Sequence, residues 1–370
     1  MIILQRVTGT KVKVDIPIDV KWIRGRDVPD FKQASTSWVF GKRFSGKSTM
    51  VETLGTKYMN KGGVVFDVFG ARDSESLAWL RSPYNDVLLV AGASVNLKTS
   101  YKWVRINEFD LKEAEQHEMV ITTPAFYSTE YEMYAALSRF VDLLKWRTVF
   151  NKVACLLVRE AKNLIASRLM SGKVSNRLEA EFDFIDLHDQ AYHTGVAAVI
   201  DSLRPISIAP DVREIANYTY IKRMGRMKIP AELYYLLRRV HPVFLRRMKV
   251  NEFLLLTDND DFAVGRNSEV PWHIKRGENL LHNLQIEVER NIAQAKEMEE
   301  KKAKPQRDKK VTPEWHNDIM TLKKEGKSYR QIVDALADKN FTLSHQQVSV
   351  EVHNHNVKRC SCFIEGVSSS

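Results

Sequence analysis

Short hydrophobic runs, separated by amphipathic stretches, alternate along most of the chain. The most apolar runs lie at residues 64–69, 87–91, 153–158 and 196–200, and each has the length of a buried strand. Residues 128–150 instead carry hydrophobic side chains at helical spacing, which predicts a long amphipathic helix. Strands that alternate with helices predict an α/β fold with a mainly parallel sheet covered on both faces, and the purely apolar run 153–158 belongs at its centre.

Weaker patterns fill the rest of this region. Residues 1–30 alternate hydrophobic and polar positions, which predicts one or two strands ahead of the main sheet. Ser128 is the expected N-cap of the long helix. We expect further strands at 101–106, 119–123, 218–222, 253–256 and 262–264, the last two as a hairpin, and helices around 77–80, 161–170, 176–193, 211–216 and 232–240.

The pattern changes after residue 283. Residues 284–310 are highly charged and nearly free of aromatic residues, so we expect an exposed helix followed by a flexible linker. Capping boxes at Ser328 and Ser344, with a glycine turn at Gly326, predict a small all-α domain of three short helices. The predicted division is 1–30 N-terminal strands, 31–283 main domain, 284–310 charged helix and linker, and 311–370 helical domain.

One polar stretch follows the apolar run 38–40 directly and matches G-x-x-x-x-G-K-[ST] without a gap. Its residues are Gly41, Lys42, Arg43, Phe44, Ser45, Gly46, Lys47, Ser48 and Thr49. A strand before it and a helix after it are the context in which backbone N–H groups curl around phosphates. We therefore expect this phosphate loop to bind ATP, with Lys47 on the terminal phosphates and the Ser48 hydroxyl on Mg²⁺.

An ATPase of this kind also needs carboxylates at neighbouring strand ends. The run 153–158 is followed by Arg159 and Glu160, and Glu160 is the candidate general base. The alternative is a solvated charge at the start of a helix. Asp67, on the run 64–69, is a second candidate for the metal, or equally a cap for the turn at Gly70.

Two segments resemble the HerA–FtsK superfamily of DNA-pumping ATPases. Glu160-Ala-Lys-Asn-Leu is similar to its Asp-Glu-Ala-His-Asn signature, and residues 195–205, ending in Leu203-Arg204-Pro205, resemble its sensor strand. Residues 208–217 resemble the segment that follows, so the resemblance covers roughly residues 35–270. It implies a RecA-like P-loop NTPase core, a ring oligomer of six subunits, and double-stranded DNA in its centre. Arg204 and Arg213 become catalytic candidates for an arginine donated across the subunit interface, or else are ordinary surface arginines.

The chain departs from that family at two positions. Arg159 stands where the family has the metal-orienting Asp, and Leu203 stands where it has Gln. A guanidinium beside the metal site would repel Mg²⁺ if it pointed inward, whereas it could also turn towards an acidic neighbour. The motifs thus predict ATP binding, and these departures leave the rate of hydrolysis open.

Likeness to the packaging ATPases of viruses implies ATP-driven packaging of double-stranded DNA, with capsid or other packaging proteins as further partners. The alternative is a DNA-binding regulator or partition factor that uses ATP only to set its oligomeric state.

The helical domain carries a second resemblance. Leu-Lys-Lys-Glu-Gly-Lys-Ser-Tyr-Arg-Gln-Ile, residues 322–332, resembles the helix-turn-helix of resolvase- and transposase-like DNA-binding domains. That likeness implies a third helix in the major groove. The candidate DNA contacts are Lys327, Arg330, His345, Gln346 and Ser349. A protein-interaction module is the alternative, and the net charge of +10 favours nucleic acid.

Composition adds constraints on location. Three cysteines make no disulfide framework and suit a reducing compartment, so we expect a cytoplasmic protein, in the host cytoplasm if viral. No hydrophobic run approaches the about 20 residues of a membrane helix, and no signal peptide is expected. The spacing of His353, His355, Cys360 and Cys362 matches no usual structural zinc site.

Overall fold

The structure is a computed structural model of the 370-residue chain. It describes residues 14–26, 28–69, 74–145, 152–161, 195–203, 216–225, 240–275, 277–303, 314–337, 348–349 and 352. The chain divides into two units, Met1–Glu299 and Glu300–Ser370, and each is described by itself.

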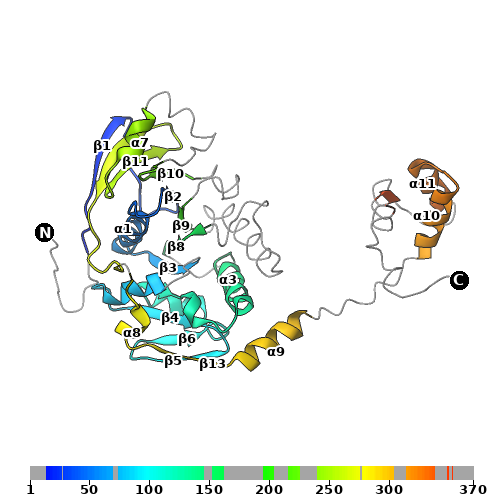
Figure 1. Ribbon diagram of the computed structural model, residues 1–370, viewed down its shortest axis with the longest axis horizontal. Helices are drawn as coiled ribbons and strands as arrows, with labels where there is room; N and C mark the ends of the chain where they lie inside the picture. The colour runs from blue at the N-terminus through cyan, green and yellow to red at the C-terminus, as the bar shows by residue number, and fades with distance from the viewer. Residues whose placement is uncertain are drawn as a thin grey trace. The chain divides into compact units, whose positions relative to one another are not determined.

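The described strands of the first unit include one 11-stranded sheet (Figure 1). They are β1 (Ile18–Arg24), β2 (Thr36–Phe40), β3 (Val64–Phe69), β4 (Val87–Ala91), β6 (Trp103–Arg105), β7 (Met119–Ile121), β8 (Ala154–Val158), β9 (Val196–Ser202), β10 (Tyr218–Ile221), β11 (Glu252–Thr257) and β12 (Phe262–Asn267). Their order is β1-β12-β11-β10-β2-β9-β8-β3-β7-β4-β6. From β10 to β6 every neighbouring pair is parallel, whereas β11, β12 and β1 extend the sheet antiparallel. The carboxyl ends of the parallel strands therefore meet along one edge.

Helices cover both faces of this sheet. The described helices of the first unit are α1 (Lys47–Asn60), η1 (Ser74–Arg81), α2 (Leu111–Glu115), η2 (Pro124–Phe126), α3 (Glu130–Lys145), α7 (Pro242–Arg247) and α8 (Leu280–Asn283), and α9 (Ile292–Ala303) runs across the boundary between the two units. Leu54 of α1 belongs to the same buried cluster as Val39 of β2, whereas Phe140 of α3 clusters with Phe40 of the same strand. Because successive strand residues point to opposite faces, α1 and α3 lie on opposite sides, as Figure 1 shows. Each such buried side chain stabilises the fold by about 1.5–3 kcal/mol.

Most expected elements of the main domain are confirmed where the structure describes them. The apolar run 153–158 is β8, between β9 and β3 in the middle of the sheet, and the hairpin is β11–β12. The expected helices around 161–170, 176–193 and 232–240 lie outside the described residues, as does nearly all of that around 211–216. No helix among the described residues is both long and apolar enough to cross a membrane.

The strand expected within residues 1–30 is confirmed as β1 in the described part of that segment. Three expectations need correction. Thr129 rather than Ser128 caps α3, because its Oγ1 accepts the Glu132 N–H. The expected strand 101–106 is shorter, as β6, and a separate strand β5 (Val95–Lys98) precedes it. The charged segment begins as a strand, β13 (Glu287–Arg290), which pairs antiparallel with β5, so its helix starts only at α9.

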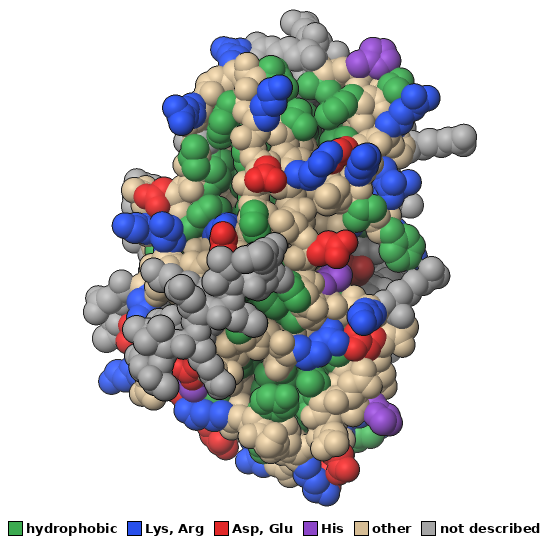
Figure 2. Space-filling model, turned by 90° about the vertical axis from the view of Figure 1, so that its left-hand side faces the viewer, with side chains coloured by type: hydrophobic (Ala, Val, Ile, Leu, Met, Phe, Trp, Pro, Cys, Tyr) green, Lys and Arg blue, Asp and Glu red, His purple; other side chains and the backbone are tan. Residues whose placement is uncertain are grey.

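The strand β1 forms one edge of the large sheet, and Figure 2 shows the side of the molecule on which β1 lies. Hydrophobic side chains lie there among scattered Lys and Arg. Exposed hydrophobic residues in and after β1 include Val20, Ile23 and Val28. Lys21 and Arg24 in the same strand add charges, which are typical of a sheet edge that avoids pairing with another chain.

The second unit contains α10 (Glu314–Lys324) and α11 (Tyr329–Ala337). Gly326 connects them with φ +80°, a left-handed conformation that favours glycine. The capping box at Ser328 is confirmed, since its N–H donates to Gln331 Oε1 at 2.9 Å and its Oγ accepts the Gln331 N–H at 3.4 Å. A small core holds the unit together; it contains Ile319, Ile332, Leu336, Val348 and Val352.

Candidate nucleotide-binding site

The phosphate loop joins β2 to α1 at the carboxyl edge of the parallel strands. Gly46, just before the helix, is left-handed with φ 77°, and Phe44 is left-handed with φ 57°. The first hydrogen bond of α1 runs from Met50 N–H to Gly46 O at 3.2 Å. The N–H groups before Met50 therefore have no intrahelical partner, which is the arrangement that binds phosphate.

Close packing explains both glycines of the loop. A Cβ on Gly41 would lie 2.7 Å from the Lys222 Cβ and 2.7 Å from Ser45 Oγ. A Cβ on Gly46 would lie 2.7 Å from the Val250 carbonyl oxygen, in addition to the strain of its positive φ. The backbone of the phosphate loop is thus held between neighbouring strands and the segment after α7.

The ends of two adjacent strands anchor the start of the loop. Lys42 N–H donates to Arg223 O at 2.9 Å, just beyond β10, and Gly41 N–H donates to Ser202 O at 3.4 Å, the last residue of β9. Lys222 is fully buried beneath the loop and donates to Asn267 Oδ1 at 2.7 Å. Burial lowers the pKa of its ammonium group to about 7.

Arg159, directly after β8, is a buried residue whose side chain is only 1% exposed. Its Nε lies 3.0 and 2.9 Å from the two Asp67 carboxylate oxygens, and its Nη2 lies 2.7 Å from Asp67 Oδ2. The guanidinium also reaches Glu52 Oε1 at 3.4 Å and Glu75 Oε1 at 3.3 Å. The sequence allowed the Arg159 guanidinium to point either into the metal site or towards an acidic neighbour. In the structure it points towards acidic neighbours.

Asp67, the second metal candidate, already uses both carboxylate oxygens in hydrogen bonds. Both of its oxygens accept from Arg159, and Oδ2 also accepts from Trp79 Nε1 at 2.9 Å. A metal bond to Asp67 would have to displace those donors, so a direct role in metal binding stays a prediction that this geometry does not favour. The β3–β8 pairing instead makes Asp67 the counter-ion of Arg159.

Glu75, which the sequence reasoning missed, lies close enough to Ser48 and Lys47 of the phosphate loop for both to lower the pKa of its carboxyl. It belongs to the first turn of η1, and its Oε1 lies 3.3 Å from Arg159 Nη1. Burial raises the pKa of the Glu75 carboxyl, but Arg159, Ser48 and nearby cations outweigh burial, so the pKa lies below its usual value. The cations around Glu75 therefore favour the charged form of its carboxyl. The sequence offered no signal for it except an acid in the segment after β3.

Glu160, the candidate general base, has a left-handed backbone with φ 46°. Its N–H donates to Asp201 Oδ1 at 2.7 Å, which ties the end of β8 to β9. Asp201 is 4% exposed, and desolvation raises its pKa to about 6, although the nearby Lys47 lowers it. The structure thus brings Lys47, Glu160 and Asp201 to the same strand edge. Asp201 was also missed by sequence reasoning.

Glu52, Glu75 and His273 have ligand atoms within 4.8 Å of one another, as a metal cluster would. His273 Nδ1 lies 2.9 Å from Glu52 Oε2, and burial, which lowers the pKa of His273, is outweighed by Glu52, so that this pKa is raised. The Arg159 guanidinium contacts both glutamates of the group. A positive charge there disfavours a further cation, and we interpret the group as a partly buried ion-pair network.

The remaining candidate residues for catalysis and DNA binding do not belong to the described part of this site. Arg204, Arg213, His345 and Gln346 fall outside the described residues. In the second unit Arg330 is exposed, Ser349 is half-buried, and Lys327 Nζ lies 3.6 Å from Glu325 Oε2. Their contact with DNA stays a prediction.

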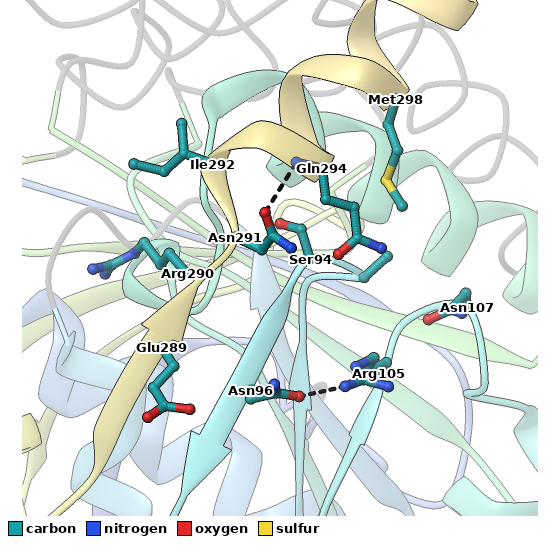
Figure 3. Close-up of a pocket in the computed structure, with 11 residues that line it drawn as sticks. Ser94, Asn96, Arg105, Asn107, Glu289, Arg290, Asn291, Ile292, Gln294 and Met298 are labelled. Atoms are coloured by element: carbon teal, nitrogen blue, oxygen red, sulfur yellow. Dashed lines mark hydrogen bonds between the residues drawn. The ribbon is translucent and has the colours of Figure 1, made fainter.

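A cavity of about 520 Å³ lies between the β5–β13 pair and the start of α9 (Figure 3). Its lining is polar: Arg105 bonds Asn96, and Asn291 Oδ1 accepts the Gln294 N–H at 3.1 Å. No residue of the phosphate loop lines it. The cavity is therefore separate from the candidate nucleotide site.

No protein-family model matches the sequence, and no curated protein matches it. Among solved structures, the genome packaging NTPase B204 from Sulfolobus turreted icosahedral virus 2, in complex with AMPPCP, is similar at 14% identity and a TM-score of 0.38, over 64% of this chain and 98% of that chain. The pCW3 conjugation coupling protein TcpA, in its monomer form with ATPgS, is similar at 13% identity and a TM-score of 0.36, over 67% of this chain and 64% of that chain.

The fold assignment rests on the sheet order and the phosphate loop of the chain itself. The phosphate loop follows β2 of a mainly parallel sheet, and α1 begins at Lys47 of the motif. The acidic residues Glu160 and Asp201 lie beside the loop, just after β8 and on β9. The chain has an α/β fold of the P-loop type, with the phosphate loop between β2 and α1 of a mainly parallel sheet.

Proposed function

We propose that this chain is an ATP-dependent translocase of double-stranded DNA that works as a ring of subunits in viral genome packaging. The observation that carries the proposal is the convergence of the phosphate loop, Lys47, Glu160 and Asp201 at one edge of the sheet. Phosphoryl transfer to water depends mainly on positioning and on charge stabilisation, which these groups can supply.

Each residue has a role in this proposal. The phosphate loop holds ATP, and Lys47 contacts its terminal phosphates. Mg²⁺, when bound with ATP, would neutralise phosphate charge, and the Ser48 hydroxyl at the start of α1 offers the kind of oxygen ligand that Mg²⁺ prefers. Glu160 orients and deprotonates the attacking water, with its backbone fixed by Asp201.

DNA binding is supported by charge and by the second unit. The net charge of +10 attracts a polyanion. The confirmed capping box and core of the second unit fit a helix-turn-helix module, in which Lys327 and Arg330 would contact phosphates. A six-membered ring and contacts with capsid proteins belong to this proposal as well.

ATP turnover with and without double-stranded DNA tests the motor. We expect DNA to stimulate wild-type turnover, and Glu160→Gln to lower it by about 10²–10⁴-fold, the usual contribution of a general base. Lys47→Ala should lose turnover through lost phosphate contacts. Lys57→Ala is the matched control, because Lys57 is on the same helix but pairs with the exposed Asp15. Displacement of a third DNA strand from a duplex would report movement along DNA.

A second candidate is an ATP-controlled DNA-binding regulator with weak or no hydrolysis. The buried Arg159 in the acidic cluster favours it, since the usual metal-orienting acid is absent from the end of β8. The same assay separates the two functions. If wild-type protein binds ATP but turns it over no faster than Glu160→Gln, with or without DNA, the regulator is correct and the motor is not.

A further inference from the structure

Phe44, within the phosphate loop, is the most exposed of the large hydrophobic side chains that the structure describes. Its exposed fraction is 71%, whereas the next residue, Ser45, is fully buried. Folding normally buries hydrophobic side chains and leaves polar ones in water. This loop does the reverse, since it exposes an aromatic ring and encloses a small polar residue.

The backbone of Phe44 also departs from what folding alone favours. Its φ of 57° lies in the left-handed region, which is unfavourable for a bulky residue with a Cβ. Residues held in such conformations cluster at ligand sites, where the surrounding contacts fix them. An exposed and strained aromatic residue in a phosphate-binding loop therefore indicates a ligand that contacts the ring.

Contacts from two other segments hold this part of the loop in place. Just beyond β10, Arg223 Nη2 donates to the Phe44 carbonyl oxygen at 3.2 Å, and Arg223 O accepts the Lys42 N–H at 2.9 Å. After α7, Val250 packs so closely that a Cβ on Gly46 would lie 3.2 Å from its Cγ1. Val250 is itself 49% exposed, so a second exposed hydrophobic side chain lies against the loop.

The position of Phe44 in the chain suits the base of a nucleotide whose phosphates occupy the loop. Phe44 precedes Lys47 by three residues, a span of at most about 11 Å. An extended nucleoside triphosphate covers a similar distance between its terminal phosphate and its base. Nucleobases stack on aromatic side chains through their flat faces, whatever the base.

Positive charge beside the ring suits the rest of such a ligand. Arg43 precedes Phe44 and is exposed. Arg223 has a buried Nε without a hydrogen-bond partner among the described residues, so its guanidinium can still donate to a ligand. A purely hydrophobic partner would bury these groups at a cost, whereas a nucleotide offers both an aromatic face and negative charge.

We propose that Phe44 binds the nucleobase in this site, with its ring stacked on the base of the nucleotide whose phosphates the loop holds. Arg223 positions the ring through the Phe44 carbonyl oxygen. This inference rests on the proposed function only in requiring that the phosphate loop binds a nucleoside triphosphate.

Calorimetric titration of the full-length protein with ATPγS and with inorganic tripolyphosphate, both with Mg²⁺, tests the inference without turnover. Tripolyphosphate carries the phosphates but no base. We expect Phe44→Ala to weaken ATPγS binding by about 5–150-fold, the usual loss of one aromatic–base stack, and to leave the Kd of tripolyphosphate unchanged. Alanine keeps a Cβ, so the left-handed backbone is equally strained in the variant.

Two further variants separate stacking from other effects. Phe44→Trp keeps an aromatic face and should retain the wild-type affinity for ATPγS. Its added fluorescence should be quenched by ATPγS but not by tripolyphosphate. Val28→Ala, which truncates a hydrophobic side chain that is 62% exposed and lies outside the loop, should behave as wild type.

Three results would count against these proposals. Equal losses of affinity for ATPγS and tripolyphosphate in Phe44→Ala would mean that the residue only shapes the loop, which overturns the stacking role. Unchanged affinity for ATPγS would overturn it as well, whether or not subunit association in sedimentation or DNA binding weakens. Wild-type protein that binds neither ligand would instead overturn the proposed ATP site.

Discussion

The Arg159 guanidinium and the Asp67 carboxylate form a buried bidentate pair between the adjacent strands β8 and β3. Nη2 lies 2.7 Å from Asp67 Oδ2, and Nε lies 3.0 Å from Oδ1. Both residues are only 1% exposed. Taking either partner away would leave a buried charge without compensation, which costs far more than a broken surface pair.

Arg159→Met should therefore destabilise the first unit by about 3–5 kcal/mol. The free energy of unfolding in urea, without nucleotide, measures this loss. The matched control is Arg266→Met, because Arg266 pairs with Glu252 at 3.0 Å but is 56% exposed. Removing that pair should cost at most about 1 kcal/mol. Equal losses in the two variants would contradict the stabilising role of the Arg159–Asp67 pair.

The tight packing of the phosphate loop gives a second prediction. Gly46→Ala places a methyl group 2.7 Å from the Val250 carbonyl oxygen, so the loop must shift and the affinity for ATP should fall by at least about tenfold. Gly62→Ala is the control for backbone strain alone, because Gly62 has φ +88° and open space around it. It should lower stability by about 1 kcal/mol but leave ATP affinity unchanged. Equal affinities of the two variants for a fluorescent ATP analogue would contradict the steric explanation.

The sequence predicted those parts of the fold that depend on local pattern. Buried parallel strands are continuous hydrophobic runs, and this placed β8 at the centre of the sheet. The phosphate loop was found because its glycines and Lys47 are adjacent in the chain. The strand β13 was missed, since its four residues, Glu287–Arg290, are charged except for Val288, and they pair with β5 far away in the sequence.

The site was predicted less completely because it is assembled from distant segments. Glu75 and Asp201 come near the loop only through the order in which β9, β8 and β3 lie beside β2. No local spacing reports such an arrangement. The orientation of the Arg159 side chain also depends on residues distant in the sequence. The sequence allowed two orientations, and the positions of Asp67 and Glu52 decide between them.

The capping box of α11 gives a prediction for the second unit. Ser328→Ala removes the side chain that accepts the Gln331 N–H, so the helix start should lose about 1 kcal/mol. Hydrogen exchange of the full-length protein, read by mass spectrometry, should then be faster by about fivefold in the first turn of α11. Exchange in α1 should stay unchanged. Unaltered protection at residues 328–337 would show that packing of Ile332 and Leu336, rather than the cap, holds this helix.

The raised pKa of Asp201 gives a prediction about pH. Its carboxyl titrates near 3.8 in the unfolded chain and at about 6 in the folded protein, because the folded environment disfavours the charge. Between these values the folded state keeps a proton that the unfolded state has lost. The stability that Asp201 contributes is therefore complete below pH 3.8 and is lost as the pH rises through about 6.

Asp201→Asn removes this titration and keeps an oxygen that can accept the Glu160 N–H. Relative to the variant, wild-type protein should lose about 2.4 kcal/mol of unfolding free energy between pH 4 and 7, which is most of the energy that corresponds to the pKa difference between 3.8 and about 6. Urea unfolding of both proteins at a series of pH values, without nucleotide, measures the difference. Parallel stability curves would mean that Asp201 ionises as it does in the unfolded chain, and that Lys47 compensates fully for its burial.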